Sequence, residues 1–196
     1  MTKELQELES RDAIGLVLDA MGVLTAVEVG VAFGENAELI LLGSNLERLL
    51  LVDPWDYVKG EDPQGYGDAI KDWTGCERYA RHKMEKFGDR AAFLKMSSAE
   101  AANLFEDESV GFVYIDANHK RPYIDRDILA WFPKVRVGGL IGGHDYHNVY
   151  MEHYTCEVKQ AVDSLFDPTQ LHTTKDVDPS WYFHKETSRA PWASAT

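Results

Sequence analysis

Short runs of β-branched and aliphatic residues alternate along this 196-residue chain with longer segments of helical periodicity. Parallel strands need crossover connections, which are usually helices, so this alternation is typical of an α/β fold with a mainly parallel sheet. Five of the short runs predict strands of that sheet, at residues 25–29, 48–52, 91–95, 110–115 and 137–141.

Helical spacing of apolar residues predicts the segments that connect these strands. The clearest amphipathic segment places Val158, Ala161, Val162, Leu165 and Phe166 on one helical face. We expect helices at residues 3–21, 36–42, 68–87, 98–105, 123–132 and 150–166, and a loop at residues 54–67.

The last part of the chain departs from a purely parallel pattern. Two short strands are expected at residues 170–174 and 180–185, joined by the turn DVDPS. A strand-turn-strand ending lets the last strand run antiparallel inside the sheet. This ending argues against a plain dinucleotide-binding fold, whose sheet is parallel throughout.

Size and composition indicate one globular domain over residues 1–196. Residues 1–22 are expected to form a covering helix, and residues 187–196 a loose tail. Cys76 and Cys156 lack the spacing of a metal site, which favours reduced thiols in a cytoplasmic protein. The first residues lack the apolar core of a secretory signal, and no apolar run approaches the ~20 residues of a membrane span.

The charge balance narrows the expected partners. The chain carries 33 acidic and 20 basic residues, a formal net charge of −13. Such a protein repels nucleic-acid phosphates and anionic lipid, so we expect a small-molecule substrate and neither nucleic acid nor membrane. A basic run at residues 78–90 is interleaved with acidic residues and predicts a solvated helix face. Homo-oligomer formation stays open.

A glycine-bearing turn follows the first strand in the sequence VEVGVAFG. Small residues at Gly30, Ala32 and Gly34 let the backbone turn sharply, and the following helix N-terminus favours an anionic ligand group. Asp53 ends the second strand, where an acid can accept hydrogen bonds from both ribose hydroxyls. Without Asp53, the turn is equally consistent with an ordinary tight connection.

Acidic residues also follow the fourth and fifth strands. Asp116 and Asp145 each lie just beyond a predicted parallel strand, and the carboxyl ends of neighbouring strands converge at one rim of an open sheet. Two carboxylates there could share a divalent ion such as Mg²⁺, which would lower the pKa of a bound substrate hydroxyl. His119, three residues after Asp116, could take the proton, although it could also be a surface loop histidine.

The motif spacing separates two cofactor classes. A nicotinamide fingerprint is GxGxxG, whereas this turn has the form GxAxG preceded by Glu28. It resembles the ExGxGxG motif of class I S-adenosylmethionine-dependent methyltransferases. The most specific match is YIDANH followed by WFPKVRVGGLIGGHDY, which is similar to O-methyltransferases of the macrocin and mycinamicin type, with catechol O-methyltransferase more distant.

This resemblance implies a Rossmann-like seven-stranded sheet of order 3-2-1-4-5-7-6, with the last strand antiparallel and helices on both faces. It implies that methyl transfer goes to a small-molecule hydroxyl of a sugar, phenol or glycoside. It also implies that Asp116 and the His144-Asp145 pair bind metal, that Asp116 also lies by the cofactor, and that His119 is the base. The residues implied to contact S-adenosylmethionine are Glu28, Gly30, Ala32, Gly34, Asp53, Trp55, Ser97 and Ser98.

One departure from the family pattern leaves alternatives open. Relatives have Glu-Asp or Asp-Asn where this chain has His144-Asp145, and an imidazole is an unusual ligand for Mg²⁺. Either another divalent cation binds, or Asp116 and Asp145 suffice with waters, or no metal binds. His144 could then be the base in place of His119. A nicotinamide-dependent oxidoreductase and a non-catalytic descendant that binds a nucleotide or partner are the competing functions.

Overall fold

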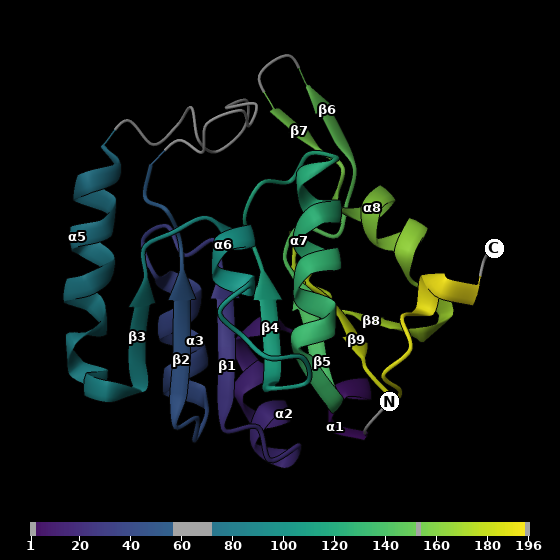
Figure 1. Ribbon diagram of the computed structural model, residues 1–196, viewed down its shortest axis with the longest axis horizontal. Helices are drawn as coiled ribbons and strands as arrows, with labels where there is room; N and C mark the ends of the chain where they lie inside the picture. Colours follow the sequence, from purple (N-terminus) through teal and green to yellow (C-terminus); the bar gives the residue numbers. More distant parts are fainter. Residues whose placement is uncertain (1–2, 57–71, 152–153, 195–196) are drawn as a thin grey trace.

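The computed structural model describes residues 3–56, 72–151 and 154–194. Seven strands form one sheet in the order β3-β2-β1-β4-β5-β9-β8 (Figure 1). The first five are mutually parallel, and β9 runs antiparallel to both β5 and β8, which confirms the predicted order and the antiparallel last strand. The bounds are β1 Thr25–Val29, β2 Arg48–Val52, β3 Ala91–Leu94, β4 Val110–Ile115, β5 Val135–Gly143, β8 Leu171–Thr173 and β9 Trp181–His184.

Helices cover both faces of the sheet, as expected. One face packs against α1 (Lys3–Gln6), α2 (Ile14–Ala20), α3 (Glu35–Gly43) and α5 (Trp73–Met84). The other face packs against α6 (Ser98–Ala102), α7 (Tyr123–Trp131) and α8 (Val158–Leu165), which lie in front of the sheet in Figure 1. Every residue of β4 is buried, because this central strand is covered from both sides.

The predicted covering helix at residues 3–21 is broken into three pieces. A 3-10 turn, Arg11–Ala13, separates α1 from α2. The Ser10 hydroxyl accepts a hydrogen bond from the Asp12 amide, and Ser10 has extended backbone geometry. Serine is favoured at such an N-cap, so it starts a new helical turn there instead of continuing the first one. Leu5, Leu8 and Ile14 are buried nonetheless.

The predicted helix at residues 150–166 forms only in its second half. A hairpin of β6 (Val149–Met151) and β7 (Tyr154–Cys156) precedes α8. This stretch is rich in aromatic and β-branched residues, which favour strands. The predicted helix at residues 68–87 is likewise present as α5 from Trp73, followed by a 3-10 segment at Glu85–Arg90. The start of that helix and most of the loop at residues 54–67 lie outside the described residues.

The expectation of a loose tail does not hold for Pro191–Ser194, which form a 3-10 turn. The Trp192 ring centroid lies 4.9 Å from that of Phe132 and 5.9 Å from that of Phe166. The partly buried ring packs against the core formed with α7 and α8, and this contact ties the segment to the domain. Nothing in the sequence predicts this anchor, because a single tryptophan carries no periodicity.

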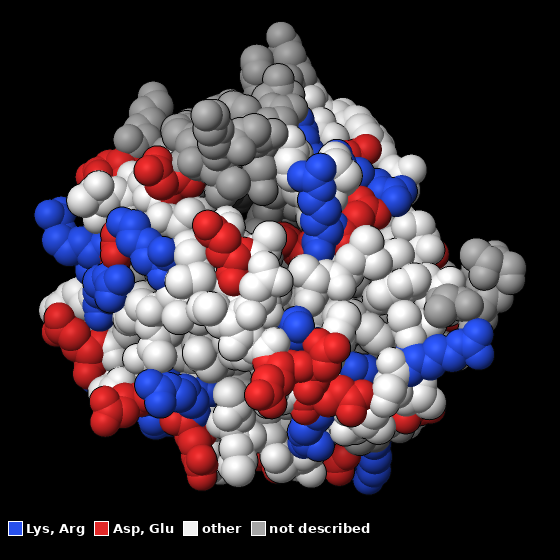
Figure 2. Space-filling view, in the orientation of Figure 1, with Lys and Arg blue, Asp and Glu red and all other residues white. Residues whose placement is uncertain are grey.

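Surface charges are locally paired. Lys83 and Lys86 of the basic run lie 3.5 and 2.5 Å from Glu38, and Arg81 lies 2.9 Å from Glu77. The prediction of a solvated face does not hold for Arg90, whose guanidinium donates to the carbonyls of Leu41, Ser44 and Leu46. On the face in Figure 2, basic and acidic side chains are interspersed. Cys76 and Cys156 are both buried, and neither forms a disulfide with another described residue. Among the described residues, no helix combines the length and the apolar character needed to cross a membrane.

Candidate active site

The glycine-bearing turn lies where β1 approaches the end of β4. Gly30, Ala32 and Gly34 all have positive φ, at 84°, 47° and 76°. A Cβ atom on Gly30 would lie 2.1 Å from the carbonyl oxygen of Asp116, so no other residue is accommodated there without a shift of the backbone. The turn thus brings bare backbone to the carboxyl ends of the two central strands, the place where open α/β sheets bind ligands.

Asp53 holds this turn in shape. Its Oδ2 accepts hydrogen bonds from the amides of Val31 and Ala32, each at 2.9 Å, and its Oδ1 accepts one from the amide of Trp55 at 2.6 Å. Burial raises the pKa of this carboxyl above its usual value, although the three amide donors act in the opposite direction. The predicted ribose acid therefore lies against the turn and already has backbone partners.

Three other predicted cofactor contacts have partners within the fold. Trp55 is only 2% exposed, and its indole N–H donates to the Ala32 carbonyl at 2.9 Å. As folded, its ring belongs to the core and offers no open face to an adenine. Ser97 caps α6 and bonds to Glu100, while the Ser98 hydroxyl accepts from the Trp131 indole at 3.0 Å. Both serines nevertheless lie beyond the end of β3, as expected.

Glu28 is a buried acid in the middle of the sheet. Its Oε1 accepts a hydrogen bond from the Asn36 side chain at 2.9 Å, whereas Oε2 has no partner among the described residues. Burial raises the pKa of Glu28 to about 8, and the charges of Asp116 and Asp53 act in the same direction. A buried carboxyl oxygen without a partner is costly, so this atom is suited to a bound polar group, and a cation beside it would favour the charged carboxylate.

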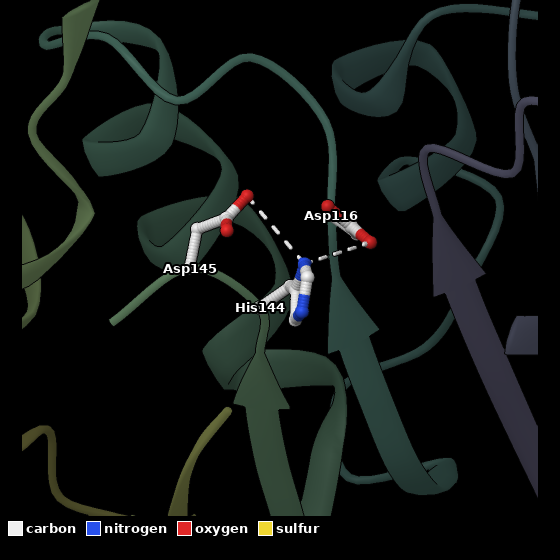
Figure 3. Close-up of side chains that lie close together, drawn as sticks. All are labelled: Asp116, His144 and Asp145. Atoms are coloured by element: carbon white, nitrogen blue, oxygen red, sulfur yellow. Dashed lines mark ion pairs between the residues drawn. The ribbon is translucent and has the colours of Figure 1, made fainter. Parts of the chain in front are cut away.

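The residues after β4 and β5 form one cluster of carboxylates and imidazoles. His119 Nε2 lies 3.2 Å from Asp116 Oδ1 and 3.3 Å from Asp145 Oδ2. Figure 3 shows His144 between the two carboxylates, with its Nδ1 3.7 Å from Asp116 Oδ2 and 3.4 Å from Asp145 Oδ2. The structure therefore brings together the residues that the sequence placed at the ends of two different strands.

Backbone contacts fix the two loops that carry the cluster. The Asp116 amide donates to the Val29 carbonyl, and the His144 amide donates to the Ile115 carbonyl. Asp145 has a positive φ of 51°, which turns its side chain back toward His119. The Asp145 Oδ1 lies 3.7 Å from His147 Nε2, so His147 borders the cluster from the other side.

The electrostatics of the cluster follow from this pairing. Burial disfavours the charged form of His119, but the hydrogen bond with Asp116 and the two carboxylate charges outweigh it and raise its pKa. Burial also disfavours the charged form of His144, but the Asp145 and Asp116 carboxylates outweigh it and raise the pKa of His144. Burial raises the pKa of Asp145, yet His144 and His119 bring it below the usual value.

Arg11, which no sequence motif marks as a site residue, lies close to this end of the sheet. Its guanidinium interacts with the Tyr114 phenol and with the charge of Asp116. Arg11 follows the break after α1, and nothing in the local sequence distinguishes it from a surface residue. Only the packing of residues 8–11 against the turn before β9 brings it here.

Fold and site together define a class I methyltransferase. A family model described as "Methyltransferase domain" matches residues 27–146, more than half of the chain, so the chain belongs to that family. It is an S-adenosylmethionine-dependent methyltransferase. The nicotinamide-dependent oxidoreductase left open by the sequence therefore does not hold. No curated protein sequence matches the chain.

Solved structures share the fold at low sequence identity. An O-methyltransferase from Bacillus cereus in complex with S-adenosylhomocysteine is 14% identical, with TM-score 0.61 over 88% of this chain and 78% of that one. The O-methyltransferase TomG from Streptomyces achromogenes, in complex with S-adenosylmethionine, is 11% identical, with TM-score 0.61 over 88% and 77%. A spermidine synthase from Thermotoga maritima is 14% identical, with TM-score 0.57 over 96% and 63%. Because this last enzyme has a different activity, the reaction must be argued from the site.

The residues present are compatible with the methyl donor. Gly30 packs directly against the Asp116 backbone, which places the turn beside that residue, and Glu28 Oε2 is a buried oxygen without a partner among the described residues. S-adenosylmethionine carries an α-ammonium group, a ribose diol and an adenine, and its ammonium could supply that partner. The polar groups of the cofactor are therefore complementary to those of the site.

Proposed function

We propose that this methyltransferase transfers the methyl group of S-adenosylmethionine to a hydroxyl oxygen of a small molecule such as a sugar, a phenol or a glycoside. The observation that carries the proposal is His119, an imidazole within 3.3 Å of two carboxylates at the ends of β4 and β5. A positioned imidazole that can accept a proton is what an acceptor hydroxyl needs before its oxygen attacks.

On the donor side, the bound cofactor supplies an electrophilic methyl group on a sulfonium. Gly30, Ala32 and Gly34 give its methionine end access to the backbone, and Glu28 accepts a hydrogen bond from its ammonium. Asp53 fixes the turn and has room on Oδ1 for one ribose hydroxyl, because that atom has a single amide donor. Ser97 and Ser98 border the adenine.

On the acceptor side, His119 takes the hydroxyl proton. Asp116 and Asp145 orient the imidazole and stabilise the imidazolium that forms, since both carboxylates lie close to Nε2. Alignment of the two reactants supplies a further part of the rate, worth up to ~7–11 kcal/mol in favourable intramolecular reactions. The protein therefore contributes mainly position and a proton acceptor.

We further propose that Asp116, His144 and Asp145 hold a divalent cation, which would polarise the acceptor oxygen. Their ligand atoms all lie within 4.8 Å of one another. Atoms that share a cation at about 2.1 Å lie about 3.0–3.4 Å apart, and the distances from His144 Nδ1 of 3.4 and 3.7 Å exceed a normal hydrogen bond but are close to that range. The two carboxylates suit Mn²⁺ or Mg²⁺, whereas the imidazole favours a softer cation such as Zn²⁺.

Methyl transfer from radiolabelled S-adenosylmethionine to a panel of sugars, phenols and glycosides tests the proposed function. Turnover of at least one acceptor is expected, and exhaustive EDTA treatment should lower it until Mn²⁺ or Mg²⁺ is added back. Full activity after chelation would remove the metal from the proposal and leave His119 in place. Binding of S-adenosylhomocysteine without turnover across the panel would instead favour a non-catalytic descendant.

A further inference from the structure

Arg11 is held near the carboxyl ends of the central strands by contacts from the other end of the chain. Its backbone amide donates to Asp176 at 2.9 Å. The Lys175 amide donates to the Glu9 carbonyl at 2.8 Å, and His172 Nε2 lies 2.5 Å from the Leu8 carbonyl oxygen. Three contacts thus tie residues 8–11 to β8 and the turn that follows it, and none of them uses the Arg11 side chain.

The strand register locates the surroundings of the Arg11 side chain. Tyr114, whose phenol interacts with the guanidinium, pairs with Glu28 on β1, so these two side chains lie next to each other on one face of the sheet. Asp116 lies two residues beyond Tyr114 and therefore on the same face. Gly30 lies two residues beyond Glu28 and touches Asp116. The guanidinium also interacts electrostatically with both Asp116 and Glu28, so it lies on the side of the sheet that carries these two acids.

Arg11 has no anionic partner of its own within the described part of the chain. No described carboxylate comes within 4.0 Å of its guanidinium, although the residue is half-buried and the Asp116 charge acts on it from farther away. Other arginines have such partners: Arg121, for example, pairs with Asp125 at 2.6 Å. A guanidinium partly removed from water favours an anion with two oxygens, to which it can donate two parallel hydrogen bonds.

Two incomplete groups therefore face the same end of β1 and β4. One is a cation without an anion, Arg11, and the other is a buried acceptor without a donor, Glu28 Oε2. An α-amino acid carries the complementary pair, a carboxylate and an ammonium two bonds apart. We propose that Arg11 binds the α-carboxylate of the methionine end of S-adenosylmethionine while Glu28 receives the ammonium, which makes Arg11 a determinant of donor specificity.

This proposal rests on S-adenosylmethionine as donor, and its test separates the two questions. Isothermal titration of the full chain would use S-adenosylhomocysteine and its decarboxylated analogue, which keeps the nucleoside, the sulfur and the amine. Arg11→Ala is expected to lower the affinity for S-adenosylhomocysteine about 10- to 150-fold, the effect of losing one charge-assisted bond. The affinity for the decarboxylated analogue should stay within about twofold.

Two matched variants sharpen the measurement. Arg11→Lys should retain part of the preference for the carboxylate, because it keeps the charge but cannot donate the two parallel hydrogen bonds. Arg78→Ala removes an exposed arginine on α5 and should change neither affinity. If Arg11→Ala binds S-adenosylhomocysteine as wild type does, or loses both ligands equally, the proposal is wrong. If the wild-type chain binds neither ligand, the donor assignment itself fails. Circular dichroism of each variant checks that it folds.

Discussion

The donor side and the acceptor side of this site are built in different ways. At the ends of β1 and β2, the Asp53 carboxylate is bonded to three backbone amides at 2.6–2.9 Å. At the ends of β4 and β5, carboxylates and imidazoles contact one another through side chains alone, at 3.2–3.7 Å. The first set has normal hydrogen-bond lengths, whereas most of the second exceeds them.

This difference shows how far the backbone alone fixes the geometry of each side. Backbone amides cannot move without distorting the sheet, so the donor turn is preorganised. The longer contacts on the acceptor side are close to the spacing of atoms that share one cation, and they join side chains to one another. We therefore expect changes on the acceptor side to affect turnover, and changes on the donor side to affect cofactor affinity and stability.

The largest expected effect is the loss of turnover on removing His119. If cofactor affinity fell instead, the division between the acceptor side and the donor side would be wrong. His119→Ala should lower kcat by ~10²–10⁴-fold, the usual contribution of a general base, and leave the affinity for S-adenosylhomocysteine nearly unchanged. Steady-state kinetics and titration on the same preparation measure both. His82→Ala, an exposed histidine on α5, is the control.

His144→Ala must be measured beside it. A near-wild-type kcat for His119→Ala together with a collapsed kcat for His144→Ala would transfer the role of base to His144. A loss of cofactor affinity in either variant would contradict the division into two sides.

The next effect concerns the pH dependence of stability on the donor side. The folded pKa of Glu28 is about 8, against an ordinary value of 4.5. Between these values the folded state holds a proton that the unfolded state has lost, so the free energy of unfolding should fall as pH rises and then level off above pH 8. The Glu28 share of this fall is at most about 4 kcal/mol between pH 5 and pH 8.

Denaturant titrations across this pH range compare wild type with Glu28→Gln. The variant side chain cannot ionise but can still accept a hydrogen bond from Asn36. Its free energy of unfolding should therefore fall less between pH 5 and pH 8, by the amount that Glu28 contributes. Parallel curves for the two proteins would mean that Glu28 does not carry a proton in the fold.

The smallest of the three effects sharpens the role of Asp53. Asp53→Ala removes the acceptor of three amides and should weaken S-adenosylhomocysteine binding by about 10- to 150-fold. Asp53→Asn keeps one oxygen acceptor, so its affinity for S-adenosylhomocysteine should lie between those of Asp53→Ala and wild type. Unchanged affinity in Asp53→Ala, measured by titration, would show that this strand end does not contact the cofactor and only shapes the turn.

The sequence determined the strands, the strand-turn-strand ending and the acids at the strand ends, whereas the sheet order came from the resemblance to the methyltransferase family. The former features follow from local patterns, because a strand is recognised by its own residues and parallel strand ends must converge at one rim. Asp116, His119, His144 and Asp145 could thus be grouped without coordinates. Their actual distances depend on loop backbone such as the positive φ of Asp145, which no pattern predicts.

Tertiary structure alone decided which of these residues face open space and which are covered. Trp55 follows Asp53 as expected but turns into the core, because its indole finds the Ala32 carbonyl and the Phe93 ring. Arg11 comes near Tyr114 and Asp116 because Asp176, 165 positions away in the chain, holds its backbone. Such contacts join segments that are distant in sequence. The direction of a side chain is therefore set by what packs against it, whereas the tendency to form a strand or a turn is set by its immediate neighbours.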